Sequence, residues 1–237
     1  MKKVFLILFI LTVQIFANEL KFDEKIIRGE LGNGIKYFVM KNKTPKNTAF
    51  AYLYVKTGSI NEEENEKGLA HFTEHMVFNG SEDFNDLEIV NVLESLGVKF
   101  GADLNAATSF TSTVYNLEID AKKLETGLKV LANMAYKATF DEKQIEKEKG
   151  VIIEEDRLRN GAFMRIFKQE LPLFYYKSDF INRLPIGDME IVKSANKKIF
   201  QNFYAKNYAP ELLNVVVVGD VDAVSYTHLT LPTICSV

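Results

Sequence analysis

The 237-residue sequence has one cysteine, no tryptophan, three histidines and almost no excess of charge of either sign. Its single Cys235 excludes an intrachain disulfide, so the folded chain must be stabilised by a hydrophobic core. Lysine and arginine number 29 against 32 aspartates and glutamates, and no basic stripe is present. This balance argues against nucleic acid or an anionic membrane surface as a partner. With 47% hydrophobic and 26% charged residues, the composition is typical of an ordinary globular domain.

The N-terminal region lacks an apolar run long enough to span a bilayer. Lys2 and Lys3 precede an apolar run at 4–16, which is followed by Ala17 and is shorter than the ~20 residues of a membrane helix. This pattern predicts a secretory signal peptide at residues 1–17, with an uncleaved membrane anchor as the alternative. We therefore expect a periplasmic or secreted protein with no stable membrane span after signal cleavage.

The C-terminal residues 225–237 lack charge when His228 is neutral, and they show no helical or strand period. They follow the apolar segment 214–220, which predicts a buried strand and a turn, after which a further packed element would be expected. We expect 225–237 to be a non-native tail, encoded out of frame or by a vector; a genuine apolar C-terminus is the alternative. The predicted domain covers residues 18–224, long enough for a sizeable core.

Strand-like and helix-like segments alternate along this domain, and no internal repeat is visible. Strands are predicted at 34–41, 48–57, 98–105, 109–119 and 214–220. Helices are predicted at 67–78, 83–96, 121–137, 141–159, 160–176 and 196–205, with Pro172, Pro185 and Gly187 breaking the segment between the last two. Short connections predict antiparallel pairs, the first between 34–41 and 48–57. The predicted fold class is α+β, with a mixed, largely antiparallel sheet covered by helices.

The first candidate site lies in the predicted helix 67–78. His71 and His75, four residues apart, lie on one helical face, and this spacing lets two imidazoles converge on one Zn²⁺ at ~2.0–2.1 Å. Glu74 falls on the same side, whereas the apolar Leu69 and Phe72 fall on another. If the histidines were ordinary core residues, they would lie among the apolar side chains. A zinc site is therefore favoured over the core alternative.

A metal held by two histidines needs a further ligand, and the predicted helix 141–159 is rich in acids. Glu148 and Glu155, seven residues apart, lie in the middle of an apolar stripe formed by Ile145, Val151, Ile152 and Leu158. A carboxylate in a core-facing stripe is costly unless it is paired, hydrogen-bonded or bound to metal. The pattern predicts that both carboxylates face inward. A buried ion pair with Arg157 or Arg159 is the alternative explanation.

These residues resemble a known family. The motif HFTEH at 71–75 is the inverted zinc motif HxxEH, and its surroundings resemble the pitrilysin/insulinase peptidases, most closely their periplasmic bacterial members. The similarity extends over roughly 31–222. The segments that carry it, in family order, are 68–80, 105–109, 148–155, 184–187 and 218–220. The fold that the resemblance implies is the metallohydrolase domain of pitrilysin and mitochondrial processing peptidase.

The resemblance implies a zinc-dependent metalloendopeptidase that hydrolyses peptides or small unfolded proteins by a metal-activated water. It assigns one Zn²⁺ to His71, His75 and Glu155, general base catalysis to Glu74, an assisting acid to Glu148, and substrate backbone pairing to Asn105 and Ala106. Glu154 is the nearest competitor of Glu155 for the metal. Strand addition by the peptide substrate would explain the role of Asn105 and Ala106.

One departure from the family concerns length. Family members contain several homologous domains, so this chain resembles an N-terminal zinc domain only. The resemblance therefore implies that C-terminal homologous domains or a partner subunit complete the enzyme, and that the isolated fragment has weak activity or none. The alternatives are a non-catalytic structural or peptide-binding subunit with the same fold, and zinc capture without hydrolysis.

Overall fold

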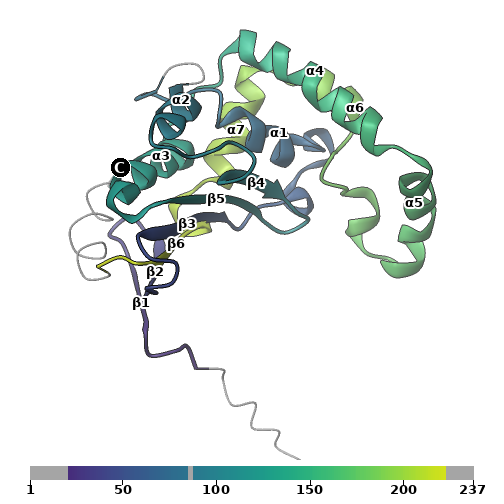
Figure 1. The fold of residues 1–237 in the computed structure, drawn as a ribbon. Coiled ribbons are helices and arrows are strands. Elements are labelled where there is room, and N and C mark those ends of the chain that lie inside the picture. Colours follow the sequence, from purple (N-terminus) through teal and green to yellow (C-terminus); the bar gives the residue numbers. More distant parts are fainter. Residues whose placement is uncertain (1–20, 85–87, 223–237) are drawn as a thin grey trace, which may run out of the picture.

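The computed structural model describes residues 21–84 and 88–222, and it contains one six-stranded sheet (Figure 1). The spatial order of the strands is β1-β2-β6-β3-β5-β4. Their bounds are β1 Ile26–Glu30, β2 Lys36–Lys41, β3 Thr48–Val55, β4 Leu104–Thr108, β5 Thr113–Asp120 and β6 Leu213–Gly219. The predicted signal peptide at 1–17 and tail at 225–237 lie outside the described residues.

The sheet is antiparallel except for one parallel pair, β2 with β6. The predicted pairing of 34–41 with 48–57 is wrong, because β6 lies between β2 and β3 and pairs with both. The sequence of β6 explains its central place: its run of four valines at 215–218 can be buried in mid-sheet. The predicted α+β class and the largely antiparallel sheet are confirmed.

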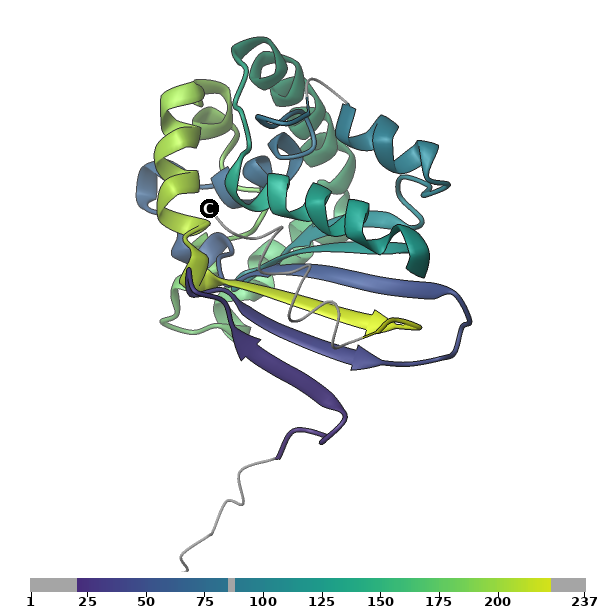
Figure 2. The same ribbon diagram turned by 90° about the vertical axis from the view of Figure 1, so that its left-hand side faces the viewer.

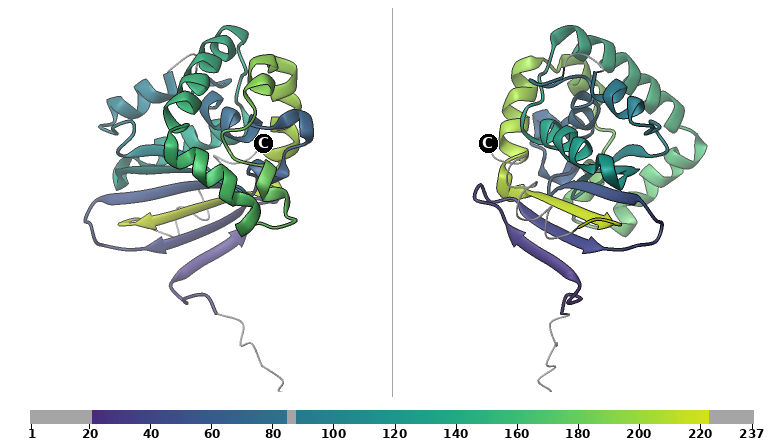
Figure 3. Two further views of the ribbon diagram at one scale, coloured as in Figure 1. Left: turned by 90° about the vertical axis from the view of Figure 1, so that its right-hand side faces the viewer. Right: turned by 60° about the vertical axis from the view of Figure 1, so that its left-hand side comes forward.

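Seven α-helices are described; six lie over one face of the sheet, whereas α5 lies to the side (Figures 2 and 3). Their bounds are α1 Leu69–Met76, α2 Glu88–Ser95, α3 Leu124–Tyr136, α4 Glu142–Arg159, α5 Ala162–Phe174, α6 Met189–Ser194 and α7 Lys197–Asn207. Six of them correspond to predicted helices, and the short α6 was not predicted. Among the described residues, no helix combines the length and apolar character needed to cross a membrane.

Two local predictions need correction, and one strand was missed. The strand predicted at 98–105 begins at Leu104, because Gly101, with a φ of +85°, turns the chain just before it. The edge strand β1 was not predicted, since its sequence has no regular alternation of apolar and polar residues. Pro172 lies inside α5 rather than ending it, close enough to the C-terminus of the helix for the last turn to form around it.

Two groups of buried apolar side chains hold the layers together. The first fills the space between the sheet and α3, where alternate residues of β3 from Ala49 to Val55 are fully buried. The second surrounds α1, where Leu69 and Phe72 pack with Ile145 and Ile152 of α4 and with aromatic side chains of α7. This second core fixes α1 against α4, and it leaves the remaining face of α1 directed toward β4.

Candidate metal centre

Helix α1 is held at its start by two local contacts. Gly68 precedes it with a φ of +101° and lies so close to Gly187 that a Cβ atom at position 68 would come within 3.1 Å of the Gly187 Cα. The Glu62 carboxylate accepts a hydrogen bond of 2.8 Å from the Ala70 amide. Because Leu69 and Phe72 are buried in the core, the other face of α1 presents the polar residues of the motif to a cavity.

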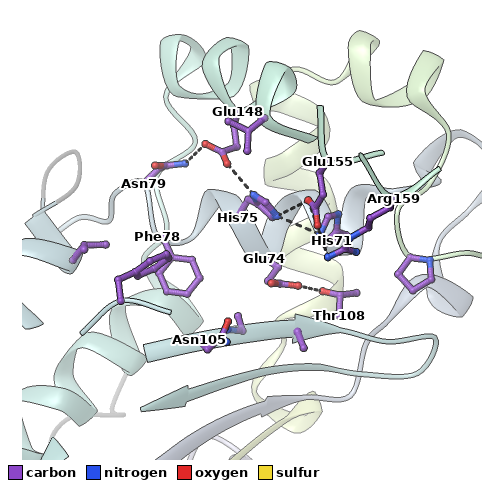
Figure 4. A pocket seen from close by; sticks show the side chains of 16 residues that line it. His71, Glu74, His75, Phe78, Asn79, Asn105, Thr108, Glu148, Glu155 and Arg159 are labelled. Atoms are coloured by element: carbon purple, nitrogen blue, oxygen red, sulfur yellow. Dashed lines mark hydrogen bonds and ion pairs between the residues drawn. The ribbon is translucent and has the colours of Figure 1, made fainter. Parts of the chain in front are cut away.

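Glu148 and Glu155 of α4 point toward this face of α1, as predicted (Figure 4). The apolar stripe that suggested this is narrower than expected: Val151 is 45% exposed and Leu158 is 69% exposed. Only Ile145 and Ile152 of the stripe reach the core, because α4 covers α1 along a narrow line and its flanks remain in solvent.

The competing carboxylate of Glu154 lies elsewhere. It is exposed and forms an ion pair with Arg157, three residues further along the same helix. Helical geometry explains the difference, since neighbouring residues on a helix point about 100° apart. Glu154 is therefore directed away from the histidines, and Glu155 toward them.

Three donor atoms converge in the cavity. The Nε2 atoms of His71 and His75 lie 3.2 Å apart, and the Glu155 Oε2 atom lies 3.6 Å from each of them. Ligands at zinc-like distances of about 2.0–2.1 Å in a tetrahedron are about 3.3 Å from one another. All three edges of this triangle are close to that value. The side chains therefore fit a single tetrahedral ion of zinc size.

Hydrogen bonds to Glu148 orient His75. The Glu148 Oε1 atom lies 2.8 Å from His75 Nδ1, and its Oε2 atom accepts a bond of 3.2 Å from the Asn79 side chain. The Nδ1 of His75 must therefore carry the proton, which leaves a lone pair on Nε2 in the neutral ring. Burial opposes the charged form of His75, but the bond to Glu148 together with the charges of Glu74, Glu148 and Glu155 outweighs this and raises the pKa of the imidazole.

His71 has a neutral ring, and Glu155 has one carboxylate oxygen without a partner among the described residues. Burial, followed by the nearby His75 and Arg159, lowers the pKa of His71 to about 3, so its ring is neutral at physiological pH. Arg159 binds Glu155 Oε1 at 2.5 Å, whereas the buried Oε2 has no hydrogen-bond partner among the described residues. The ion pair that was an alternative to metal binding therefore exists, but it occupies only one carboxylate oxygen.

Glu74 lies beside the triangle on the same helix. Its carboxylate is buried, and Oε2 accepts a hydrogen bond of 2.5 Å from the Thr108 hydroxyl at the end of β4 (Figure 4). Burial raises the pKa of Glu74, although the bond from Thr108 opposes the shift. Neither Thr108 nor Asn79 was singled out in the sequence. Thr108 follows Ala106 by two residues, and strand alternation places both on the same face, so that signal was available.

The cavity has a volume of about 780 Å³ and is bounded on one side by β4, the edge strand of the sheet. Asn105 and Ala106 both line it, as do the apolar side chains of Phe78 and Phe100. The backbone amide of Ala106 donates a hydrogen bond of 2.8 Å to the side chain of its neighbour Asn105. The outer edge of β4, which pairs with no further strand among the described residues, lies next to the converging donor atoms.

Two imidazoles and a carboxylate that converge beside the buried Glu74 match the donor set that is typical of mononuclear zinc hydrolases. A family model described as insulinase (peptidase family M16) matches residues 37–160. The chain belongs to this family of peptidases. The resemblance seen in the sequence is thereby confirmed.

The relatives include named zinc proteases. The probable zinc protease PqqL of Haemophilus influenzae is 41% identical over 208 residues, which are 86% of this chain and 22% of that protein. Its Escherichia coli counterpart is 34% identical over 213 residues, 89% of this chain and 23% of that protein. The crystal structure of the first half of the periplasmic protease PqqL from E. coli matches with a TM-score of 0.87 at 33% identity, covering 91% of this chain and 47% of that one. The chain thus spans less than a quarter of the length of these proteases.

Proposed function

We propose that this chain is the zinc-binding catalytic domain of a metalloendopeptidase acting on peptides or small unfolded proteins. The observation that carries the proposal is the convergence of His71 Nε2, His75 Nε2 and Glu155 Oε2, 3.2–3.6 Å apart, within one cavity that also contains Glu74. The zinc proteases among the relatives support the same function.

His71, His75 and Glu155 would hold one zinc ion. When bound, zinc supplies a Lewis acid that lowers the pKa of water and polarises a peptide carbonyl. Glu148 positions His75 by accepting its Nδ1 proton in a hydrogen bond, and thereby keeps the lone pair of Nε2 directed at the site. Arg159 restrains Glu155 in the same way through its other oxygen.

Glu74 is the proposed general base. Its carboxylate faces the same cavity as the donor atoms and accepts the proton of the attacking water, and it can return that proton to the amine that leaves. A buried carboxyl with a raised pKa is suited to both transfers, because its proton affinity is closer to neutral pH. The Thr108 hydroxyl fixes one oxygen of Glu74 and leaves the other for the proton.

The substrate is proposed to bind as an added strand along β4. Strand addition uses main-chain hydrogen bonds, so it suits extended peptides of varied sequence. Asn105 and Ala106 provide the contact points, and a substrate carbonyl would replace the Asn105 side chain as acceptor for the Ala106 amide. Phe78 and Phe100, which line the cavity, would contact apolar substrate side chains.

Because the chain spans 22% and 23% of the PqqL proteases, we propose that further homologous domains or a partner subunit complete the active enzyme. The E. coli relative is described as periplasmic, and the apolar run at 4–16 is typical of a secretory signal. We propose a periplasmic or secreted location for this protein on those two grounds.

Metal content per chain, measured by elemental analysis of purified protein, tests the site. The wild type is expected to hold about one zinc, and Glu155→Gln is expected to lose it. Glu154→Gln is the matched control, because that neighbouring carboxylate is exposed and paired with Arg157. A folded wild type without zinc, or equal loss in both variants, would contradict the proposal.

Peptide cleavage tests the chemistry. Glu74→Gln is expected to retain zinc and lose turnover, because the amide cannot accept the proton of water. Cleavage should be compared for the chain alone and for the chain supplied with the remaining domains. Turnover that survives Glu74→Gln would refute the role of Glu74, and full zinc binding without any turnover in the completed protein would favour the non-catalytic alternative.

A further inference from the structure

Helix α5 is attached to the described domain by little of its own surface. It has 13 residues, and Leu171 is the only one of them that is buried. The helix follows α4 at the side of the molecule opposite α2 and α3 (Figure 1), and it faces the viewer in the left part of Figure 3. Its sequence is nevertheless strongly amphipathic, so an apolar face exists without a partner in the described residues.

Four exposed apolar side chains of α5, together with one at the end of α4 and one just after α5, are called the α5 surface. They are Leu158, Phe163, Ile166, Leu173, Phe174 and Tyr176. Phe163 and Leu173 are 79% and 80% exposed, although they lie three turns apart on one side of the helix. Single exposed apolar residues are common on proteins, but six in and next to one 13-residue helix indicate an interaction site.

The exposed area is sufficient for a stable interface. A large side chain buries about 150–250 Å² when it is aromatic, so the six together offer on the order of 700 Å². A standard protein interface buries about 800 Å² on each partner. The α5 surface alone therefore provides most of one side of such an interface.

The partner must be a lasting one. A helix of 13 residues is marginal in water unless an apolar face is packed, and Leu171 is the only residue of α5 that the described domain buries. A substrate that arrives and leaves would expose this face in every cycle. A further domain of the same protein would cover this face permanently. The match covers only 47% of the first half of E. coli PqqL, so that relative contains additional polypeptide from which such a domain could form.

We infer that the α5 surface is the docking face for another domain of the same longer protein, which packs an apolar face onto Phe163 and Leu173. The inference rests on family membership and on the exposed side chains, and it does not require the metal site or peptidase activity. Docking there would also place the added domain beside Arg159 of α4, which borders the cavity.

Binding in trans tests the inference. The chain and the polypeptide that continues it in its own gene are expressed separately, and their association is measured by titration calorimetry. Phe163→Asp and Leu173→Asp are each expected to weaken binding at least about tenfold, the loss typical of a central interface residue. Phe22→Asp is the matched control, since Phe22 is also an exposed phenylalanine but lies before β1; its affinity should stay within about twofold.

Circular dichroism and zinc content on the same samples separate the possible failures. Both substituted residues are exposed, so the variants should fold and keep the metal content of the wild type. Absence of binding by the wild type, unchanged binding by both variants, or self-association of the chain through this face in place of docking would each overturn the inference. None of these results would alter the zinc content, which tests the proposed function separately.

Discussion

Replacing the buried carboxyl of Glu62 by an amide should stabilise the domain at neutral and alkaline pH. Glu62 is 4% exposed and lies near the start of α1, where Oε1 accepts the Ala70 amide and Oε2 has no hydrogen-bond partner among the described residues. Burial raises the pKa of this carboxyl from 4.5 to about 7, although the amides of Ala70 and Gly68 and the charge of Arg183 oppose the shift.

The sign of the effect follows from proton linkage. Because the pKa of Glu62 is higher in the folded state than in the unfolded state, the folded state binds the proton more tightly. Stability from this group is therefore fully present below pH 4.5 and is lost as the pH rises through about 7. At 1.36 kcal/mol per pKa unit, ionisation of Glu62 costs up to about 3 kcal/mol of folding free energy at pH 8.

Urea denaturation of wild type and Glu62→Gln at pH 5 and pH 8, with chelator present throughout, measures this cost. Glutamine keeps an acceptor for the Ala70 amide and cannot ionise, so the variant should gain about 2–3 kcal/mol over wild type at pH 8 and much less at pH 5. Glu63→Gln is the control, because Glu63 is exposed. An equal difference at both pH values, or a variant less stable at pH 8, would show that Arg183 holds Glu62 as a stable anion and would refute the reasoning.

Three further predictions concern the site. Glu148→Gln should reduce zinc affinity about 10–100-fold in a chelator competition, because His75 loses its charged partner, and unchanged affinity would refute that role. Thr108→Val should lower kcat of the completed enzyme about 10–100-fold with little change in KM, because a hydrogen bond to a charged group contributes a free energy of that size. Thr108→Ser keeps the hydroxyl and should restore kcat. Zinc at 100 times its Kd should stabilise the wild type by about 2.7 kcal/mol in urea denaturation and leave Glu155→Gln unchanged, so equal stabilisation of both would place the metal elsewhere.

The parts of the site that could be predicted were those fixed by helical geometry. His71 and His75 share a face because they are four residues apart, and Glu148 and Glu155 share one because they are seven apart. Strand alternation places Thr108 on the same face as Ala106, but its contact with Glu74 depends on how closely β4 approaches α1, a distance that no local pattern contains. Its contact with Glu74 was therefore found only in the structure.

In the fold, too, features set by local sequence could be predicted, and features set by tertiary contacts could not. The helices were predicted from their apolar periods, but the sheet order was not, because the choice of neighbour for β3 depends on every strand that could compete for its edge. The valines at 215–218 lie between β2 and β3, and β6 pairs with both strands. The exposure of Val151 and Leu158 likewise depends on which parts of α4 find a neighbour.

The central position of β6 sets the order in which this domain can fold. β2 and β3 are made early, yet each lacks one neighbour until Leu213–Gly219 has been synthesised. The sheet therefore closes only when nearly the whole domain is available, and pairings this distant in sequence form slowly. Until then β3 lacks one neighbour, and an unpaired apolar strand edge favours aggregation of the nascent chain. A chain that ends before Leu213 would lose the middle of the sheet rather than its rim, so shortening from this end should abolish folding altogether.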